Sequence, residues 1–235
     1  MPENRPDNNV PICRRGWVTR QETLRRWRDG IWEGPGQPAG QQAYLRWHLD
    51  FLERFYQPPQ DPEAAILDVG CGYMLKNFQQ AGMIGRLLQR LGGRYTGIDP
   101  IDQWFDIAPD RPVCLCHGMG ESLPWDDATF DVVLNLGVLD HTLQPKRVLA
   151  EIRRVLKPGG TFWFANSFTT GSRTGVFWEK LAHRLGLEKN HRFVWTSPDL
   201  QRLVAAAGFE IARTDYCRCD TSYYIQAQPE GEGNP

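Results

Sequence analysis

The stretch Ile66-Leu67-Asp68-Val69-Gly70-Cys71-Gly72 decides the fold of this 235-residue chain. It begins as a short apolar run and ends in a glycine-rich turn that leads into a helical pattern. Glycine lets the backbone pass close to a ligand, because it has no Cβ. Open α/β sheets bind their ligands at this place, beyond the carboxyl end of a strand. The stretch therefore predicts an α/β sheet with a ligand site at its glycine turn.

An acidic residue follows at the end of the next predicted strand. Asp99 lies in Gly97-Ile98-Asp99-Pro100, 31 residues after Asp68. A carboxylate at that position can accept hydrogen bonds from both hydroxyls of a ribose. A glycine loop alone is a weak signal, and the acid makes it stronger. Together they predict a nucleoside pocket.

From Ala64 onward, short apolar runs alternate with helical segments, as is typical of a doubly wound sheet with right-handed crossovers. Strands are predicted at 65–69, 94–98, 113–116, 132–136, 161–165, 209–213 and 222–226. Helices are predicted at 75–91, 145–156, 175–185 and 198–207, the last with Ser197 as its N-cap. The last two strands leave no room for a crossover helix, so they predict an antiparallel edge hairpin. We therefore expect a seven-stranded, Rossmann-like α/β fold.

The first sixty residues predict two helices that form an N-terminal cap. Thr19 and Glu22 fit a capping box for the first helix. The second has a wide aromatic face made of Tyr44, His48, Phe51, Leu52, Phe55 and Tyr56, and it ends at Pro58-Pro59. The tryptophans of this region either form a lid over the ligand site or pack the helices onto the sheet, and packing is the commoner role; they are Trp17, Trp27, Trp32 and Trp47. The expected organisation is a helical cap or lid over 1–60, the α/β domain over 61–228 and a disordered tail over 229–235.

Composition excludes several classes of protein. The formal net charge is −1 and no long run of Lys or Arg occurs, so binding to a nucleic acid by dense phosphate neutralisation is not expected. No apolar stretch approaches the roughly 20 residues that span a bilayer. The N-terminus lacks the pattern of a secretion signal. We therefore expect a cytoplasmic monomer or homodimer without a membrane partner.

The cysteines suggest neither a disulfide scaffold nor a metal site. Six cysteines are too few for such a scaffold. Cys114-x-Cys116 and Cys217-x-Cys219 have the spacing of zinc half-sites, but the expected strand order puts them at opposite edges of the sheet. We therefore expect small buried thiols and no metal.

Six ordered motifs between about Ala64 and Gln226 make the chain similar to the class I S-adenosylmethionine-dependent methyltransferases, and among them to small-molecule enzymes related to quinone-biosynthesis methyltransferases. The motifs are ILDVGCG (66–72), GID (97–99), GESLPWDDATFDVV (120–133), GVLDHT (137–142), EIRRVLKPGG (151–160) and TSPDLQRLVAAAGFE (196–210). The resemblance implies S-adenosylmethionine as the cofactor and a small molecule as the methyl acceptor.

The resemblance also assigns positions around that cofactor. The methionine end is held by Asp68 and by the backbone of Gly70, Cys71 and Gly72, and the ribose by Asp99. Pro100 and Ile101 flank the adenine, and the loop of Met119, Gly120 and Glu121 borders its edge. Asn135 and Leu136 lie under the sulfonium.

The methyl group of a sulfonium is already activated, so such a protein must chiefly hold the acceptor in line and exclude water. No metal is needed. For a hydroxyl acceptor, a base with a pKa near neutrality helps to remove the proton, and His141 is the first candidate. Asp140 either orients His141 or faces away. His191 and His183 are further candidates.

The leading hypothesis is methyl transfer to an oxygen or nitrogen of a small molecule, with oxygen favoured. Met74 stands where related proteins carry a third glycine, and Met119 where they carry an acid that reads the adenine amino group. These departures motivate an alternative, a non-catalytic S-adenosylmethionine-binding regulator or scaffold. A nicotinamide-dependent oxidoreductase would share the strand-glycine-acid arrangement, but it gives no reason for the LPW and KPGG segments.

Overall fold

The computed structural model describes residues 45–101, 107–167, 195–217 and 222–230, together with Phe177, Leu181 and Phe193. Several sequence predictions lie outside these residues. They are the first N-terminal helix, the helix over 175–185 apart from two of its positions, the final tail residues 231–235, and the side chains of Trp17, Trp27, Trp32, His183 and His191.

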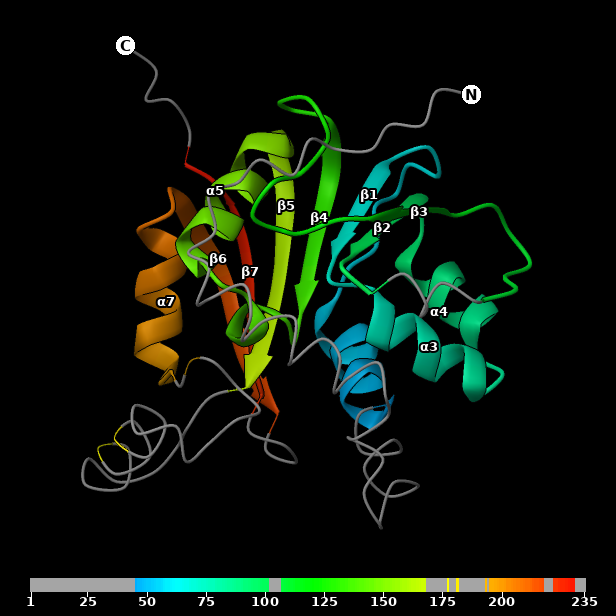
Figure 1. The fold of residues 1–235 in the computed structure, drawn as a ribbon, viewed down its shortest axis with the longest axis horizontal. Coiled ribbons are helices and arrows are strands. Elements are labelled where there is room, and N and C mark those ends of the chain that lie inside the picture. Colours follow the sequence, from blue (N-terminus) through cyan, green and yellow to red (C-terminus); the bar gives the residue numbers. More distant parts are fainter. Residues whose placement is uncertain are drawn as a thin grey trace.

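The described chain forms one seven-stranded sheet in the order β3-β2-β1-β4-β5-β7-β6 (Figure 1). The strands are β1 (Ala65–Val69), β2 (Arg94–Asp99), β3 (Cys114–His117), β4 (Phe130–Leu136), β5 (Leu156–Ser167), β6 (Phe209–Cys217) and β7 (Ser222–Pro229). The first five are parallel, and β7 is antiparallel to both β5 and β6. The predicted Rossmann-like sheet and its antiparallel edge hairpin are therefore confirmed.

Helices cover both faces of the sheet (Figure 1). α3 (Gly72–Gln80) and α4 (Ile84–Leu91) contribute to one apolar layer, and α5 (Pro145–Val155) and α7 (Ser197–Ala205) to the other. In β1, Ile66 belongs to the first layer, whereas Leu67 and Val69 belong to the second. Because side chains alternate along a strand, Asp68 shares the face of Ile66. The acid of the first motif is therefore on the α3 and α4 side of the sheet.

The prediction of one helix over 75–91 is wrong, because the structure has two helices in this region, α3 and α4. α3 ends at Gln80, and Gly82 has a φ of +67°. The N–H of Met83 donates to the carbonyl of Phe78 and the N–H of Gly82 to that of Gln79. These two bonds form the Schellman arrangement that ends a helix at a left-handed glycine. The apolar periodicity resumes in α4, which is why the sequence read as one helix.

The N-cap of α7 is Thr196 rather than the predicted Ser197. The Thr196 side chain accepts a hydrogen bond from the N–H of Asp199, and the Asp199 carboxylate accepts one from the N–H of Thr196. Ser197 is the first helical residue. Asp199 decides between the two caps, because only Thr196 has an acid three positions later.

Two further expectations are corrected at the sheet edges. The disordered tail does not begin at residue 229, since Pro229 pairs with Phe209 and the N–H of Glu230 donates to the carbonyl of Gly208. The thiol of Cys114 is exposed rather than buried, and that of Cys116 is half-buried, because β3 is an edge strand. Cys217 belongs to β6, at the opposite edge.

The aromatic N-terminal segment packs on the sheet. Residues 45–50 are helical and lead into one π-helical turn, η1 (Phe51–Phe55). Phe55 meets Trp163 of β5 edge-on, with 5.4 Å between ring centroids. Trp47 is 7% exposed, and a Cβ placed on Gly137 would lie 2.6 Å from its Cη2 atom. Trp47 therefore packs the N-terminal segment onto the sheet, which is the commoner of the two predicted roles. None of the described helices is long and apolar enough to cross a bilayer.

Replacing Thr196 by alanine tests the corrected cap. We expect Thr196→Ala to lower the free energy of unfolding by about 1 kcal/mol, because the first turn of α7 loses a hydrogen-bond acceptor. Ser197→Ala, one residue further, should change it by less than about 0.5 kcal/mol. Urea unfolding of both variants measures this. Equal losses would contradict the assignment of the cap.

Candidate functional site

The candidate site lies where β1 ends between β2 and β4. Asp68 pairs with Gly97 of β2 on one side and with Leu134 of β4 on the other. The chain moves outward from β1 to β2 and β3, and then returns to place β4 on the other flank of β1. Such a reversal of strand order leaves room beyond the strand ends, where α/β proteins bind ligands.

The turn after β1 requires glycine at Gly70. This residue has a φ of +87°, and its N–H donates to the carbonyl of Ile98 over 2.7 Å. A Cβ placed there would lie 2.4 Å from Cγ1 of Val138. Cys71 follows as the buried N-cap residue of α3, and Gly72 is the first helical residue. The turn therefore brings the N-terminus of α3 to the end of β1.

Asp99 joins the end of β2 to that turn. Its Oδ2 atom accepts a hydrogen bond from the N–H of Gly72 over 3.0 Å, and its Oδ1 atom accepts one from the N–H of Ile101 over 2.8 Å. The negative charge at the start of α3 is favourable for the helix dipole. A carboxylate offers about four lone-pair sites, so these two donors do not by themselves saturate it. The side chain is 4% exposed, so both bonds form away from bulk water.

Asp68 is buried next to Asp99. Its Oδ2 atom accepts a hydrogen bond from the hydroxyl of Tyr95 over 2.7 Å. Burial raises the pKa of Asp68 to about 7, the charge of Asp99 raises it as well, and the bond from Tyr95 opposes the rise. Asp68 therefore changes charge near neutral pH.

The end of β4 contributes Asn135. Its Nδ2 atom donates to the carbonyl of Val69 over 3.0 Å, which ties β4 to the glycine turn. Its Oδ1 atom is buried and has no hydrogen-bond partner among the described residues. A buried acceptor left without a donor costs about 1–3 kcal/mol. The atom therefore fits a ligand that brings a hydrogen-bond donor to this place. The next residue, Leu136, is buried and apolar.

A loop between β3 and β4 closes the same end of the sheet. A Cβ placed on Gly120 would lie 2.9 Å from Cγ1 of Val69, so the loop backbone packs against β1. The Oε1 atom of Glu121 accepts hydrogen bonds from the N–H groups of Leu143 over 2.8 Å and Gln144 over 3.3 Å. Glu121 thus anchors the loop to the start of α5. Met119, just before, is half-buried.

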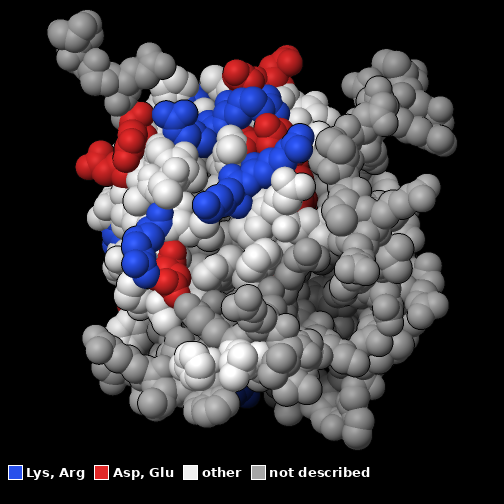
Figure 2. Space-filling view, turned by 60° about the vertical axis from the view of Figure 1, so that its left-hand side comes forward, with Lys and Arg blue, Asp and Glu red and all other residues white. Residues whose placement is uncertain are grey.

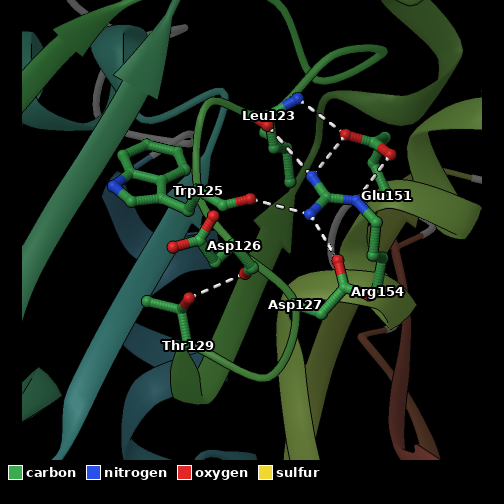
Figure 3. A network of polar contacts seen from close by, with 7 residues as sticks. All are labelled: Leu123, Trp125, Asp126, Asp127, Thr129, Glu151 and Arg154. Carbon is green, nitrogen blue, oxygen red and sulfur yellow. Dashed lines mark hydrogen bonds and ion pairs between the residues drawn. The ribbon is translucent and has the colours of Figure 1, made fainter.

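The same loop is held further along by α5, through the contacts drawn in Figure 3. Arg154 donates to the carbonyls of Leu123 and Trp125 over 3.0 and 2.7 Å, and to the carboxylate of Asp127 over 2.9 Å. Glu151 accepts from Arg154 and from the N–H of Leu123. The LPWDD segment therefore folds around one arginine of the EIRRVLKPGG segment.

His117 holds the loop that follows β2. It ends β3 opposite Asp99, and its Nε2 atom lies 3.0 Å from the carbonyl of Pro100. Ile101, next in the loop, is 7% exposed. The two residues assigned to the adenine are thus fixed beside Asp99.

His141 lies just beyond β4, in the 3-10 turn η3 (Leu139–His141). Its side chain is 11% exposed, and its Nε2 atom lies 3.8 Å from Oδ1 of Asp140. The imidazole therefore lies beside the buried carboxylate of Asp140. The other two candidate histidines are outside the described residues.

Sequence reasoning missed two residues of this site. Tyr95 contacts Asp68, and Val138 packs against Gly70. The alternation along 94–99 indicates that Tyr95 and Asp99 share a face, but only the pairing of β1 with β2 brings Tyr95 next to Asp68.

Figure 2 shows basic and acidic side chains close together in the upper part of the described surface. Lys157 pairs with Asp131 over 2.9 Å, and Arg202 with Asp199 over 2.7 Å. Within the described ranges, no cluster of three or more His, Cys, Asp or Glu side chains has the arrangement of a metal site.

Comparison with known proteins identifies the domain. Residues 67–164 match the family model for a methyltransferase domain. A ubiquinone biosynthesis O-methyltransferase of Nitrosococcus oceani is 33% identical over 147 residues, which cover 55% of this chain and 56% of that protein. A tRNA U34 carboxymethyltransferase of Methylococcus capsulatus is 29% identical over 209 residues, 85% of this chain and 60% of that protein. The chain thus spans little more than half the length of either relative.

A solved structure shows the same fold. The 1,6-didemethyltoxoflavin-N1-methyltransferase of Burkholderia thailandensis, crystallised with S-adenosylhomocysteine, aligns with a TM-score of 0.57 and 18% identity over 94% of this chain and 93% of its own. The sheet order, the glycine turn and the strand-end acid therefore agree with the methyltransferase domain that residues 67–164 match.

Proposed function

We propose that the chain binds S-adenosylmethionine at the carboxyl ends of β1, β2 and β4 and transfers its methyl group to an oxygen or nitrogen of a small molecule. The observation that carries the proposal is the pair of hydrogen bonds that fixes the Asp99 carboxylate beside the glycine turn. That geometry suits a ligand with two adjacent hydroxyls and a chain that runs along the turn.

The residues present fit this cofactor. Asp99 would accept the ribose hydroxyls, and the Gly70–Gly72 turn with Cys71 would carry the methionine end past Asp68. The unpartnered Oδ1 of Asn135 offers an acceptor for a donor of the ligand. The adenine would lie between Pro100, Ile101 and the loop of Met119, Gly120 and Glu121, which are assigned by resemblance.

When bound, the cofactor supplies a methyl group that its positive sulfur has already activated. The chain then has to place the acceptor in line with the breaking bond between carbon and sulfur and keep water away. Leu136 supplies an apolar surface at the end of β4. For a hydroxyl acceptor, His141 takes the proton that is lost as the new bond between carbon and oxygen forms, and Asp140 stabilises the charged imidazole. His191 is a second candidate for this base.

Two features favour a small acceptor over a nucleic acid. The net charge is −1, and the Lys and Arg side chains in the upper part of Figure 2 have Asp and Glu side chains among them. A protein that neutralises many phosphates needs a continuous basic area. A relative is named for its action on tRNA, so tRNA belongs among the acceptors tested.

The departure at Met74 does not favour the non-catalytic alternative. Met74 lies in α3, is 2% exposed and belongs to the apolar layer between that helix and the sheet. Its bulk is therefore taken up in the core.

Asp99→Asn tests the ribose assignment. The variant keeps the shape of the side chain but loses the charge and one acceptor, so we expect S-adenosylhomocysteine to bind about 10- to 100-fold more weakly by calorimetry. Asp131→Asn is the matched control. That carboxylate accepts from the N–H of Ala65 and pairs with Lys157, and it meets β1 at its opposite end. Its loss should affect stability but not affinity. Unchanged affinity in Asp99→Asn would contradict the proposed pocket.

His141→Ala tests the base. With a radiolabelled methyl donor and a panel of phenols, amines and tRNA, we expect transfer to a phenol to fall by about 10²- to 10⁴-fold. Affinity for S-adenosylhomocysteine should stay within about 2-fold, because the imidazole acts on the acceptor. If the variant turns over phenols as fast as the wild type, the base lies elsewhere.

A further inference from the structure

We propose that Tyr95 is a positioning residue for the cofactor, whose hydroxyl holds Asp68 and Cys71 in place so that the Asp68 carboxylate receives the positively charged methionine end. The inference rests on the proposed function, because it concerns the same ligand. It adds a residue from inside β2 that none of the matched motifs contains.

The strand register makes the contact possible. Ile66 pairs with Tyr95 and Asp68 pairs with Gly97, so Tyr95 lies on the face of Asp68 but one step further back. Gly97 has no side chain to block the way between them. The Tyr95 hydroxyl therefore reaches forward to Oδ2 of Asp68 at 2.7 Å, and both side chains are buried. A larger residue at position 97 would separate them.

The same hydroxyl also reaches the glycine turn. A Cβ placed on Gly97 would lie 2.5 Å from Sγ of Cys71, so the thiol fills the space that Gly97 leaves. Burial raises the pKa of the Tyr95 hydroxyl, and Cys71 contributes to that rise, which indicates that the two side chains lie next to each other. A tyrosine hydroxyl can donate one bond and accept another, so it can donate to Asp68 while it accepts from the thiol. Tyr95 thus links the end of β1 to the turn that starts α3.

Among the described residues, the groups that interact with the buried carboxylate of Asp68 do not neutralise it. The titratable groups that shift its pKa are Tyr95 and Asp99 from β2, whereas Cys71 of the turn and Tyr56 are themselves affected by the charge of Asp68. None of these groups is a cation. An isolated buried charge is costly unless it is paired. The ammonium and sulfonium of S-adenosylmethionine would supply the missing positive charge.

This arrangement gives the binding a definite dependence on pH. The pKa of Asp68 is raised by burial to about 7, so the free protein loses stability as pH rises from about 4 to 7 and the carboxylate ionises. A cationic ligand favours the ionised form, so its affinity should rise as pH increases through 7. The bond from Tyr95 lowers this pKa, so its removal should move the midpoint of the binding curve to higher pH.

Tyr95→Phe tests the inference by calorimetry between pH 6 and 9. The phenyl ring keeps the packing and removes the hydroxyl. We expect S-adenosylmethionine to bind about 5- to 20-fold more weakly than to the wild type at pH 7. The midpoint of the pH dependence of binding should lie at a higher pH, and the difference in affinity from the wild type should be smaller at pH 9. Adenosine, which lacks the methionine end, should bind as it does to the wild type.

Tyr56→Phe is the matched control. Tyr56 is also a buried tyrosine, but its hydroxyl donates to the carbonyl of Leu91 over 2.7 Å. The control should lose stability while it keeps the affinity and the midpoint of the wild type. Equal affinity and midpoint in Tyr95→Phe and the wild type would overturn the inference, and so would an equal loss for adenosine, which a structural role alone would cause.

A measurement on the unaltered protein keeps the inference testable if Tyr95→Phe fails to fold. At pH 7, binding of S-adenosylmethionine should release protons from Asp68, as read from calorimetry in two buffers of different ionisation enthalpy, and binding of adenosine should release none. Binding without proton release would overturn the inference. A wild type that binds neither ligand would instead contradict the proposed function.

Discussion

The carboxylate of Asp99 is the contact on which the rest of the site depends. Two hydrogen bonds that it accepts join the end of β2 to the first turn of α3 and to the loop that follows β2. The glycine turn can approach so closely only because Gly70 adopts a left-handed conformation against Val138. We propose that this fixed charge at the start of α3 receives the ribose of the cofactor without a rearrangement of the turn. Preorganisation of this kind lowers the cost of binding.

The apolar layers on the two faces of the sheet hold the strands and loops that form this site. The aromatic segment at 45–56 fills the layer next to α3, and Trp47 from this segment lies against Gly137 just beyond β4. On the other side, Arg154 and Glu151 of α5 hold the loop that leads back to Gly120 (Figure 3). His48 is buried among these aromatic side chains, and burial lowers its pKa to about 3, so it stays neutral. The packed aromatic side chains and the contacts of Arg154 and Glu151 therefore hold the site's strands and loops in position.

Much of this was predictable from the sequence, because the signals are local. Alternating apolar runs predicted the strands, and the glycine turn with Asp99 predicted a candidate site whose ligand remains a proposal. The errors arose where the apolar pattern alone does not determine the end of a helix, its capping residue or a contact between strands. Gly82 ends α3 although the apolar period continues, and Asp199 selects Thr196 over its neighbour as cap. The contact of Tyr95 with Asp68 depends on the register between two strands, which no local pattern specifies.

A crystal structure with S-adenosylhomocysteine tests the central claim most directly. The account predicts both ribose hydroxyls within hydrogen-bond distance of the Asp99 carboxylate, with the amino acid end of the ligand over the Gly70–Gly72 turn on the side of Asp68. A ligand bound elsewhere on the sheet, or bound with Asp99 contacting only the backbone of Gly72 and Ile101, would contradict it.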